Sequence, residues 1–336
     1  MKQLGIIGAG RIGRVHAESI SRMAAAAVKT LADPFMSPEI EKWAAQLGVD
    51  KCVKDYKEII ADPAIDGVLI CSPTDTHADI SLEAIAAGKH VFCEKPVSQK
   101  LDEILAVKKA LAASPNIKYL VGFNRRFDHN FKAARAAVEQ GKVGEQHIVR
   151  ITSRDPGPPP IEYIKVSGGL FMDMTIHDFD MLRYLTGSEV DEVFVRAANK
   201  VDPAIGQAGD IDTAVITLTM KNSVIAIIEN SRKAAYGYDQ RVEVFGSKGM
   251  VSIGNDAPST AVISTEDGVT GEKPLHFFLE RYMDAYVQEA RDFVTAIEND
   301  TPVPVGIEDG LQSVLIAMAC ALSHKESRAV KMSEIG

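Results

Sequence analysis

Long apolar runs, paired cysteines and basic clusters are all missing from this chain. No apolar run is long enough to cross a bilayer, and the first residues become rich in glycine too early for a signal peptide. The four cysteines, Cys52, Cys71, Cys93 and Cys320, have neither the spacing of metal ligands nor that of a disulfide framework. A net charge of -9 without a basic cluster argues against a general nucleic-acid surface. These absences favour a cytoplasmic protein whose thiols are reduced and buried, and they indicate no metal site.

The composition is that of a globular protein, with 46% apolar and 25% charged residues among 336. A chain of this length is expected to form two domains, because a single hydrophobic core stops growing at about 250–300 residues. The pattern of the sequence changes near Asn124, and no internal repeat or low-complexity segment is present. We therefore expect one domain over residues 1–123 and a second over residues 124–336.

The chain opens with the pattern of a dinucleotide-binding fold. A short apolar strand is expected over residues 3–8, and it runs into a glycine-rich turn, GAGRIG, at residues 8–13. A helical pattern over about residues 14–23 and an apolar strand over residues 28–32 follow, and the strand ends at Asp33. Strand, glycine turn, helix, strand and acid come in the order that a Rossmann domain requires.

Each residue of the glycine turn has a role in such a site. Gly8 permits the tight turn, Gly10 lets the backbone approach a pyrophosphate, and Gly13 lets the helix pack closely on the strand. The helix N-terminus offers N–H groups and a positive dipole to the phosphates, and Arg11 and Ile12 lie within the same turn. Asp33, about 20 residues beyond the last glycine, is placed to accept hydrogen bonds from ribose hydroxyls and would repel a 2′-phosphate. NAD is therefore favoured over NADP.

Further α/β units follow the first. Strands are expected over residues 65–71, 89–93 and 118–123, and helices over residues 76–87 and 101–112. They extend the parallel sheet of the first domain. In open parallel sheets, ligands bind beyond the carboxyl ends of the strands. Several residues lie at such ends and are candidates for the cofactor site: Ser72, Pro73, Thr74, Glu94 and Lys95. His77 could also face the cofactor, although a histidine at the start of a helix is more often solvated.

The second half has long runs of strand pattern without intervening helices, so a large open and mostly antiparallel sheet is expected. A helix is expected over residues 127–140, another around Asp173 and His177, and two more at the end of the chain, over residues 277–299 and 307–324. A proline-rich loop occupies residues 155–160. Strands are expected over residues 146–154, 190–200, 212–220, 224–231, 240–245 and 250–253, with hairpin turns at 221–222 and 246–249. The fold class is thus an α/β Rossmann domain joined to an α+β domain, whose apolar sheet predicts sheet-to-sheet oligomerisation.

Lys95, Asp173 and His177 are the candidate catalytic residues. Asp173 and His177 are four residues apart on an expected helix, so their side chains share one face. Gly168 and Gly169 precede that helix and allow close approach of the backbone to a ligand. Oxidation of an alcohol needs a base for the hydroxyl proton while hydride leaves for the nicotinamide. His177 is suited to be that base, and Lys95 to hold the substrate oxygen or relay its proton.

Four motifs together resemble the Gfo/Idh/MocA oxidoreductases, two-domain NAD(P) enzymes that act mainly on sugars and cyclitols. The motifs lie at residues 8–13, 94–96, 122–128 and 168–177. Residues 172–181 and 230–241 are most similar to the members that oxidise inositol. The resemblance covers essentially the whole chain.

The resemblance implies NAD-dependent oxidation of myo-inositol to the 2-keto inosose, with Lys95, Asp173 and His177 as the catalytic set. It also implies a homotetramer built through the C-terminal sheets. On the same grounds, further residues are expected to lie near the polyol substrate: Asn124, Arg125, Arg126, Asp155 and Tyr236. A dehydrogenase of an aldose or another cyclitol, a non-catalytic NAD-binding sensor and a redox-assisted glycosidase remain as alternatives on the same fold.

Overall fold

The computed structural model describes residues 1–335, and the chain forms two compact units. The first unit combines Met1–Phe127 with Met283–Gln312, and the second combines Asp128–Tyr282 with the residues from Ser313 onward. This division differs from the boundary expected at residue 123. The chain returns to the first unit near its C-terminus, and neither composition nor periodicity signals such a return.

The first unit contains a six-stranded parallel sheet in the order β3-β2-β1-β4-β5-β6. This is the strand order of a Rossmann domain. Its elements are β1 (Lys2–Ile7), α1 (Arg11–Ser21), β2 (Ala26–Ala32), α2 (Pro38–Gln46), β3 (Lys51–Val53), α3 (Lys57–Ala61), β4 (Gly67–Ile70), α4 (His77–Ala86), β5 (His90–Cys93), α5 (Leu101–Ala112), β6 (Tyr119–Val121) and α11 (Met283–Asn299). Short 3₁₀ turns occupy Thr74–Thr76 and Asn124–Phe127.

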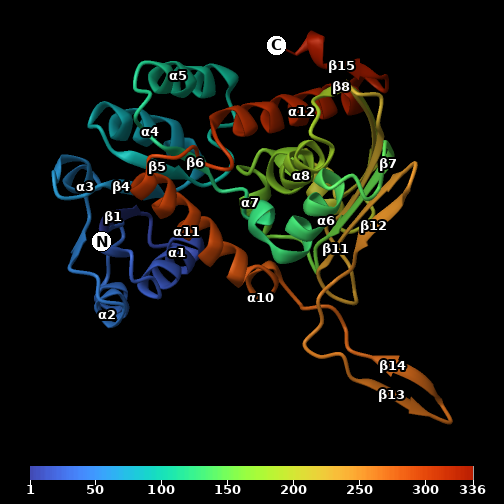
Figure 1. Ribbon diagram of the computed structural model, residues 1–336, viewed down its shortest axis with the longest axis horizontal. Coiled ribbons are helices and arrows are strands. Elements are labelled where there is room, and N and C mark those ends of the chain that lie inside the picture. Colours follow the sequence, from blue (N-terminus) through green and yellow to red (C-terminus); the bar gives the residue numbers. More distant parts are fainter. Residues whose placement is uncertain (336) are drawn as a thin grey trace. The chain divides into compact units, whose positions relative to one another are not determined.

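Helices cover both faces of this sheet, which explains why its strands are apolar without alternation. Every residue of β4 and of β6 is buried. Helix α1 packs against α11, and α4 packs against α5. Figure 1 shows α4 and α5 on one side of the sheet and α1 and α11 on the other. Helix α11, which comes late in the chain, thus completes the cover of the nucleotide-binding sheet.

The second unit contains a seven-stranded sheet in the order β12-β11-β7-β10-β9-β8-β15. Only the pair of β7 and β10 is parallel, so the mostly antiparallel sheet expected from the sequence is confirmed. Its elements are α6 (His129–Glu139), β7 (Gln146–Arg154), α7 (Ile161–Ile164), α8 (Ile176–Thr186), β8 (Val190–Ala198), α9 (Pro203–Gln207), β9 (Thr213–Met220), β10 (Ile225–Ser231), β11 (Asp239–Gly246), β12 (Gly249–Ile253), α10 (Phe278–Arg281) and β15 (Val330–Lys331). A 3₁₀ turn occupies Met332–Glu334, and α12 (Ile307–Glu326) contributes residues to both units.

One face of this sheet is buried and the other is exposed. Strand β9 alternates buried and exposed residues along its length, as expected for a sheet covered on one side. Helix α8 packs against β7, and α6 packs against α8 and β12. A small hairpin of β13 (Val262–Thr265) and β14 (Gly268–Gly271) projects away from the sheet, and all its residues are exposed (Figure 1). The open face and the hairpin leave apolar side chains in solvent.

Several elements differ from their expected form. The helix expected over residues 277–299 is interrupted at Tyr282, which separates α10 from α11. The helix expected around Asp173 begins with a π-helical turn, Phe171–Thr175, before α8. The helices α2, α3, α7 and α9 and the strands β3, β13, β14 and β15 were not expected at all. Within residues 1–335, no helix is both long and apolar enough to span a membrane.

Candidate active site

All six strands of the first unit's sheet end at the same edge, because parallel strands share their direction. A candidate site residue follows five of them: Gly8 after β1, Asp33 after β2, Ser72 just beyond β4, Glu94 after β5 and Asn124 just beyond β6. The strand order reverses between β1 and β4. This reversal is the switch point at which open α/β sheets bind ligands.

The glycine turn between β1 and α1 is shaped by steric need at two positions. Gly8 has a φ of 105°, and a Cβ there would lie 2.6 Å from the carbonyl oxygen of Cys71. A Cβ on Gly13 would lie 1.9 Å from the carbonyl oxygen of Gly8, so helix and strand could not approach as they do. Gly10 is the N-cap of α1, and a Cβ there would meet no atom of the described chain within 4 Å. The space beside Gly10 fits the backbone approach of a pyrophosphate.

Asp33 is fixed against this turn by two main-chain hydrogen bonds. Its Oδ2 accepts from the N–H of Ala9 at 2.7 Å, and its Oδ1 accepts from the N–H of Phe35 at 2.8 Å. Each carboxylate oxygen can accept a second hydrogen bond. The carboxylate therefore links the end of β2 to the glycine turn and still has acceptor capacity for a ribose. No side chain of the described chain caps α1, so its N-terminal dipole is available to phosphate.

His77 is buried, and the expectation of a solvated histidine at this helix start is wrong. Its Nδ1 lies 2.8 Å from the carbonyl oxygen of Pro96, and its Nε2 lies 2.9 Å from that of Ser72. Burial alone lowers the pKa of His77, but the neighbouring Cys93 and the two carbonyl oxygens together raise that pKa to about 9. Because carbonyl oxygens only accept, both ring nitrogens carry hydrogen. His77 is thus a cation that joins the loop after β4 to the loop after β5, and its ring nitrogens are occupied by protein.

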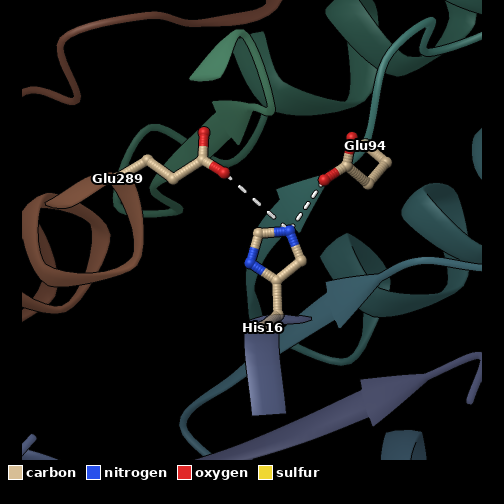
Figure 2. A group of neighbouring side chains, drawn as sticks. All are labelled: His16, Glu94 and Glu289. Carbon is tan, nitrogen blue, oxygen red and sulfur yellow. Dashed lines mark hydrogen bonds and ion pairs between the residues drawn. The ribbon is translucent and has the colours of Figure 1, made fainter. Parts of the chain in front are cut away.

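Glu94 takes part in a buried cluster that the sequence did not indicate. Its Oε1 lies 2.7 Å from Nε2 of His16, which is on α1, and the same nitrogen lies 3.9 Å from Oε1 of Glu289, which is on α11. Figure 2 shows the imidazole pointing toward both carboxyl groups. One ligand atom from each of the three residues lies within 4.8 Å of the others. Lys95 follows Glu94 directly and is partly exposed.

The turn after β6 holds three residues for which a substrate contact was expected. Asn124 and Arg125 are buried, and Arg126 is nearly so. Arg126 donates to Oδ1 of Asp309 at 2.8 Å and to the carbonyl oxygen of Pro304 at 3.3 Å. These contacts give Arg126 a structural role, and the substrate contact stays a prediction for all three residues.

Asp173 lies in the π-helical turn that precedes α8 in the second unit. Its Oδ1 accepts from the hydroxyl of Tyr163 at 2.9 Å, and its Oδ2 accepts from Nη1 of Arg232 at 3.3 Å. The hydrogen bonds of a π-helical turn join residues five apart instead of four, and such turns are frequent at functional sites. Asp173 is partly exposed, and His177, on the first turn of α8, is partly exposed as well.

Of the two glycines before this turn, Gly169 makes a close approach within the chain, while the approach to a ligand stays a prediction. Gly168 and Gly169 have φ values of 84° and 81°, which favour glycine. A Cβ on Gly169 would lie 2.7 Å from Oδ1 of Asp210, and that oxygen accepts from the N–H of Leu170 at 3.0 Å. The close approach at Gly169 is therefore made to Asp210. The same carboxylate lies 3.6 Å from Nη2 of Arg232.

Asp178 is fully buried, and Nδ2 of Asn230 donates to its Oδ2 at 2.8 Å. Tyr236 donates to Oδ2 of Asp239 and accepts from Nη1 of Arg154. The backbone of Asp155 is paired with Ser231 and Ala234. Asp178 is therefore part of the core, while the substrate contacts expected of Tyr236 and Asp155 remain predictions.

Comparison with known proteins assigns the family. A model described as an oxidoreductase family with an NAD-binding Rossmann fold matches residues 2–123, and the model of the GFO/IDH/MocA C-terminal domain matches residues 131–252. The chain belongs to the Gfo/Idh/MocA oxidoreductase family. The resemblance seen in the sequence motifs is thereby confirmed, as are the fold class and NAD as the cofactor.

Individual relatives match over nearly the full length. The chain is 46% identical over 333 residues to a myo-inositol 2-dehydrogenase of Thermotoga maritima, covering 99% of each chain. It is also 46% identical to an inositol 2-dehydrogenase of Rhizobium meliloti, covering 98% of this chain and 99% of the relative. Among solved structures, a scyllo-inositol dehydrogenase of Lactobacillus casei with bound NAD(H) and scyllo-inositol superposes with a TM-score of 0.92, at 32% identity and 99% coverage of each chain.

Proposed function

We propose that this protein is an NAD-dependent dehydrogenase that oxidises myo-inositol to the 2-keto inosose. The observation that carries the proposal is the likeness to two inositol 2-dehydrogenases at 46% identity, which extends through both units of the chain. The first unit supplies the edge of a nucleotide-binding sheet, and the second supplies Asp173 and His177. A neutral polyol offers many hydroxyls and no charge, so hydrogen-bonding groups suit it.

The proposed reaction removes a hydride from the ring carbon and a proton from its hydroxyl group, which is two electrons and two protons in total. NAD, when bound, supplies the acceptor for the hydride. His177 or Lys95 takes the hydroxyl proton as the C–H bond breaks. The ammonium of Lys95 balances the negative charge that develops on the oxygen. Hydrogen bonds from Tyr163 and Arg232 hold the carboxylate of Asp173, which lies about one helical turn before His177.

The chain's own residues fit the cofactor. The uncapped N-terminus of α1 and the open space at Gly10 accommodate a pyrophosphate, and Asp33 accommodates a ribose diol. We propose that Asp33 also sets the preference for NAD, because a carboxylate repels the 2′-phosphate of NADP.

Initial rates with NAD across a panel of myo-inositol, scyllo-inositol and glucose test the proposal. We expect the highest kcat/KM with myo-inositol. A preference for scyllo-inositol is the second candidate, which the likeness to the scyllo-inositol dehydrogenase supports. Preference for glucose would overturn the inositol assignment. NAD binding without any NADH formation would favour a sensor, and release of sugar from a glycoside without net NADH would favour a glycosidase.

We further propose that the protein is a cytoplasmic homotetramer assembled through the open face of the second sheet and that it serves inositol catabolism. Four exposed apolar residues, one from each of four adjacent strands, form a row by strand register: Ile225 pairs with Ile148, Ile148 with Phe245, and Phe245 with Met250. Contiguous apolar surface of this kind marks an interface. A second copy of the same face would cover it with the symmetry that homo-oligomers use.

A further inference from the structure

The cluster of His16, Glu94 and Glu289 lies within the first unit and has no role in the function proposed above. His16 and Glu289 are fully buried, and the side chain of Glu94 is 13% exposed. Both oxygens of Glu289 and Nδ1 of His16 have no hydrogen-bond partner within residues 1–335. A buried carboxylate without a partner is costly, so the cluster must neutralise the charge of Glu289 in some way.

Three titratable groups share this space, two carboxyls and one imidazole (Figure 2). Nε2 of His16 lies 2.7 Å from Oε1 of Glu94 and 3.9 Å from Oε1 of Glu289, so its one hydrogen is donated to Glu94. Burial and the nearby Glu94 raise the pKa of Glu289 well above its usual range. Burial, Glu94, Cys93 and Glu289 also raise the pKa of the Cys71 thiol, so Cys71 adds no negative charge to the cluster.

A bound metal ion is a less suitable explanation for the same cluster. Two ligands of a tetrahedral zinc ion are about 3.3 Å apart, given metal–ligand distances of about 2.0–2.1 Å. The 2.7 Å between Nε2 of His16 and Oε1 of Glu94 is instead the distance of a hydrogen bond. A proton on Glu289 removes the repulsion between the two carboxyls without requiring any movement of the three side chains.

Glu94 is held on several sides. The ring of His16 packs edge-on against Phe92, 4.7 Å between centroids, and against Tyr286 at 5.7 Å. A Cβ on Gly122 would lie 3.0 Å from Oε2 of Glu94, so a glycine there leaves room for the carboxylate. Beyond Lys95, His77 binds the carbonyl oxygen of Pro96 at 2.8 Å. Lys95 thus lies between two residues that buried histidines fix.

We propose that Glu289 is a protonated carboxylic acid and that His16 is a positioning residue, which places the main chain of Lys95 through the carboxylate of Glu94. A charged Glu289 would compete with Glu94 for the hydrogen on His16 and repel its carboxylate. The inference rests on the proposed role of Lys95 in catalysis. Neither His16 nor Glu289 touches the reacting atoms in this account.

The first test uses His16→Phe, which keeps a ring against Phe92 and Tyr286 but removes the hydrogen that Glu94 accepts. We expect kcat with myo-inositol to fall about 100-fold, as a small misplacement of a catalytic group does, while NAD affinity and thermal midpoint change little. His16→Gln, whose amide can donate, should recover part of that loss. Equal loss in both variants, or a loss of NAD affinity alone, would overturn the positioning role.

A double-mutant cycle shows whether His16 acts through Lys95. In the background of Lys95→Ala, adding His16→Phe should lower kcat no further, because the group that it positions is gone. Full additivity of the two effects would overturn the inference. If Lys95→Ala alone retained normal turnover, the proposed role of Lys95 would have failed instead, which distinguishes the two cases.

The protonation of Glu289 is tested without any assay of activity. Infrared difference spectra between the wild type and Glu289→Gln should show the C=O stretch of a buried protonated acid that is lost in the variant. Absence of the band, or stoichiometric metal in the purified wild type that the variant lacks, would overturn the proposal.

Discussion

Nη1 of Arg232 lies 3.3 Å from Oδ2 of Asp173, and Nη2 of the same guanidinium lies 3.6 Å from Oδ2 of Asp210. Arg232 is 1% exposed, and it follows the last residue of β10. A buried cation therefore holds the proposed catalytic Asp173 together with Asp210, whose Oδ1 accepts from the N–H of Leu170 on the segment that carries Asp173. Because removing one member of a buried ion pair leaves the others uncompensated, Arg232 affects both stability and catalysis.

Arg232→Met should lower the free energy of unfolding by about 3 kcal/mol, the usual cost of breaking a buried ion pair. It should also lower kcat, because Asp173 loses a partner that fixes its carboxylate. Denaturant unfolding and steady-state rates measure the two effects. Arg328→Met is the matched control: Arg328 pairs with Glu326 and Glu334, all three side chains are exposed, and its loss should cost far less stability. Equal effects in the two variants would contradict this assignment.

Lys95→Ala should lower kcat by orders of magnitude and leave the dissociation constant of NAD nearly unchanged. The reason is that an ammonium which balances charge on the reacting oxygen acts in the transition state more than in cofactor binding. Lys100→Ala serves as the control, because Lys100 is 71% exposed and pairs with Glu103. Near-normal turnover of Lys95→Ala would remove Lys95 from the mechanism.

Asp33→Ser should raise the KM for NAD and reduce the preference for NAD over NADP. Loss of the carboxylate removes both the ribose acceptor and the repulsion of a 2′-phosphate. The hydrogen bond from Ala9 to Asp33 is lost as well, so some loss of thermal stability is expected. Asp202→Ser is the control: Asp202 accepts from the N–H of Ala204 at 2.8 Å in the second unit, and its change should leave the ratio of kcat/KM for the two cofactors unaltered. An unchanged ratio in Asp33→Ser would show that Asp33 is not the ribose ligand.

His77 should make stability depend on pH. Its pKa in the folded protein is about 9, above the usual 6.5, so the folded state holds the proton more tightly than the unfolded state. The stabilisation from this proton is full below about pH 6.5 and is lost as the pH rises toward 9. Unfolding of the wild type and His77→Gln across this range measures it. A difference between the two proteins that stays constant with pH would contradict the cationic assignment.

Phe245→Lys should weaken the proposed tetramer, because it places a charge in the middle of the apolar row on the open sheet face. Light scattering across protein concentrations measures the assembly. Leu105→Lys places the same charge at an exposed apolar position on α5, outside that face, and should leave the assembly unchanged. A wild type that stays monomeric at every concentration would refute assembly through this face.

Local patterns in the sequence were sufficient to predict much of the structure of the nucleotide-binding unit. The glycine turn, the strand ends and Asp33 follow from short-range sterics and periodicity, and the bounds of α5 and β7 agree with those expected. Helix α2 was missed although Ser37 caps it and Pro38 begins it, which is a recognised helix start. That signal was present in the sequence.

Other features depend on contacts between distant residues. No local motif marks His16 or Glu289, and the motif at residues 230–241 does not reveal that Arg232 pairs with Asp173, because these partners lie far away along the chain. The position of His77 at the start of a helix predicts a solvated side chain. Its ring is buried instead, because its two nitrogens bond to the carbonyl oxygens of Ser72 and Pro96. The return of α11 to the first unit is of the same kind. Such pairings arise from tertiary packing, which single-sequence periodicity does not encode.

The most direct test of the central claim follows the hydride itself. Myo-inositol carrying deuterium at C2 is incubated with NAD and the purified protein, and the reduced cofactor is examined by mass spectrometry. We predict one deuterium per NADH formed and a 2-keto inosose in equal amount. NADH without deuterium, or no NADH with myo-inositol while another polyol reacts, would contradict the account.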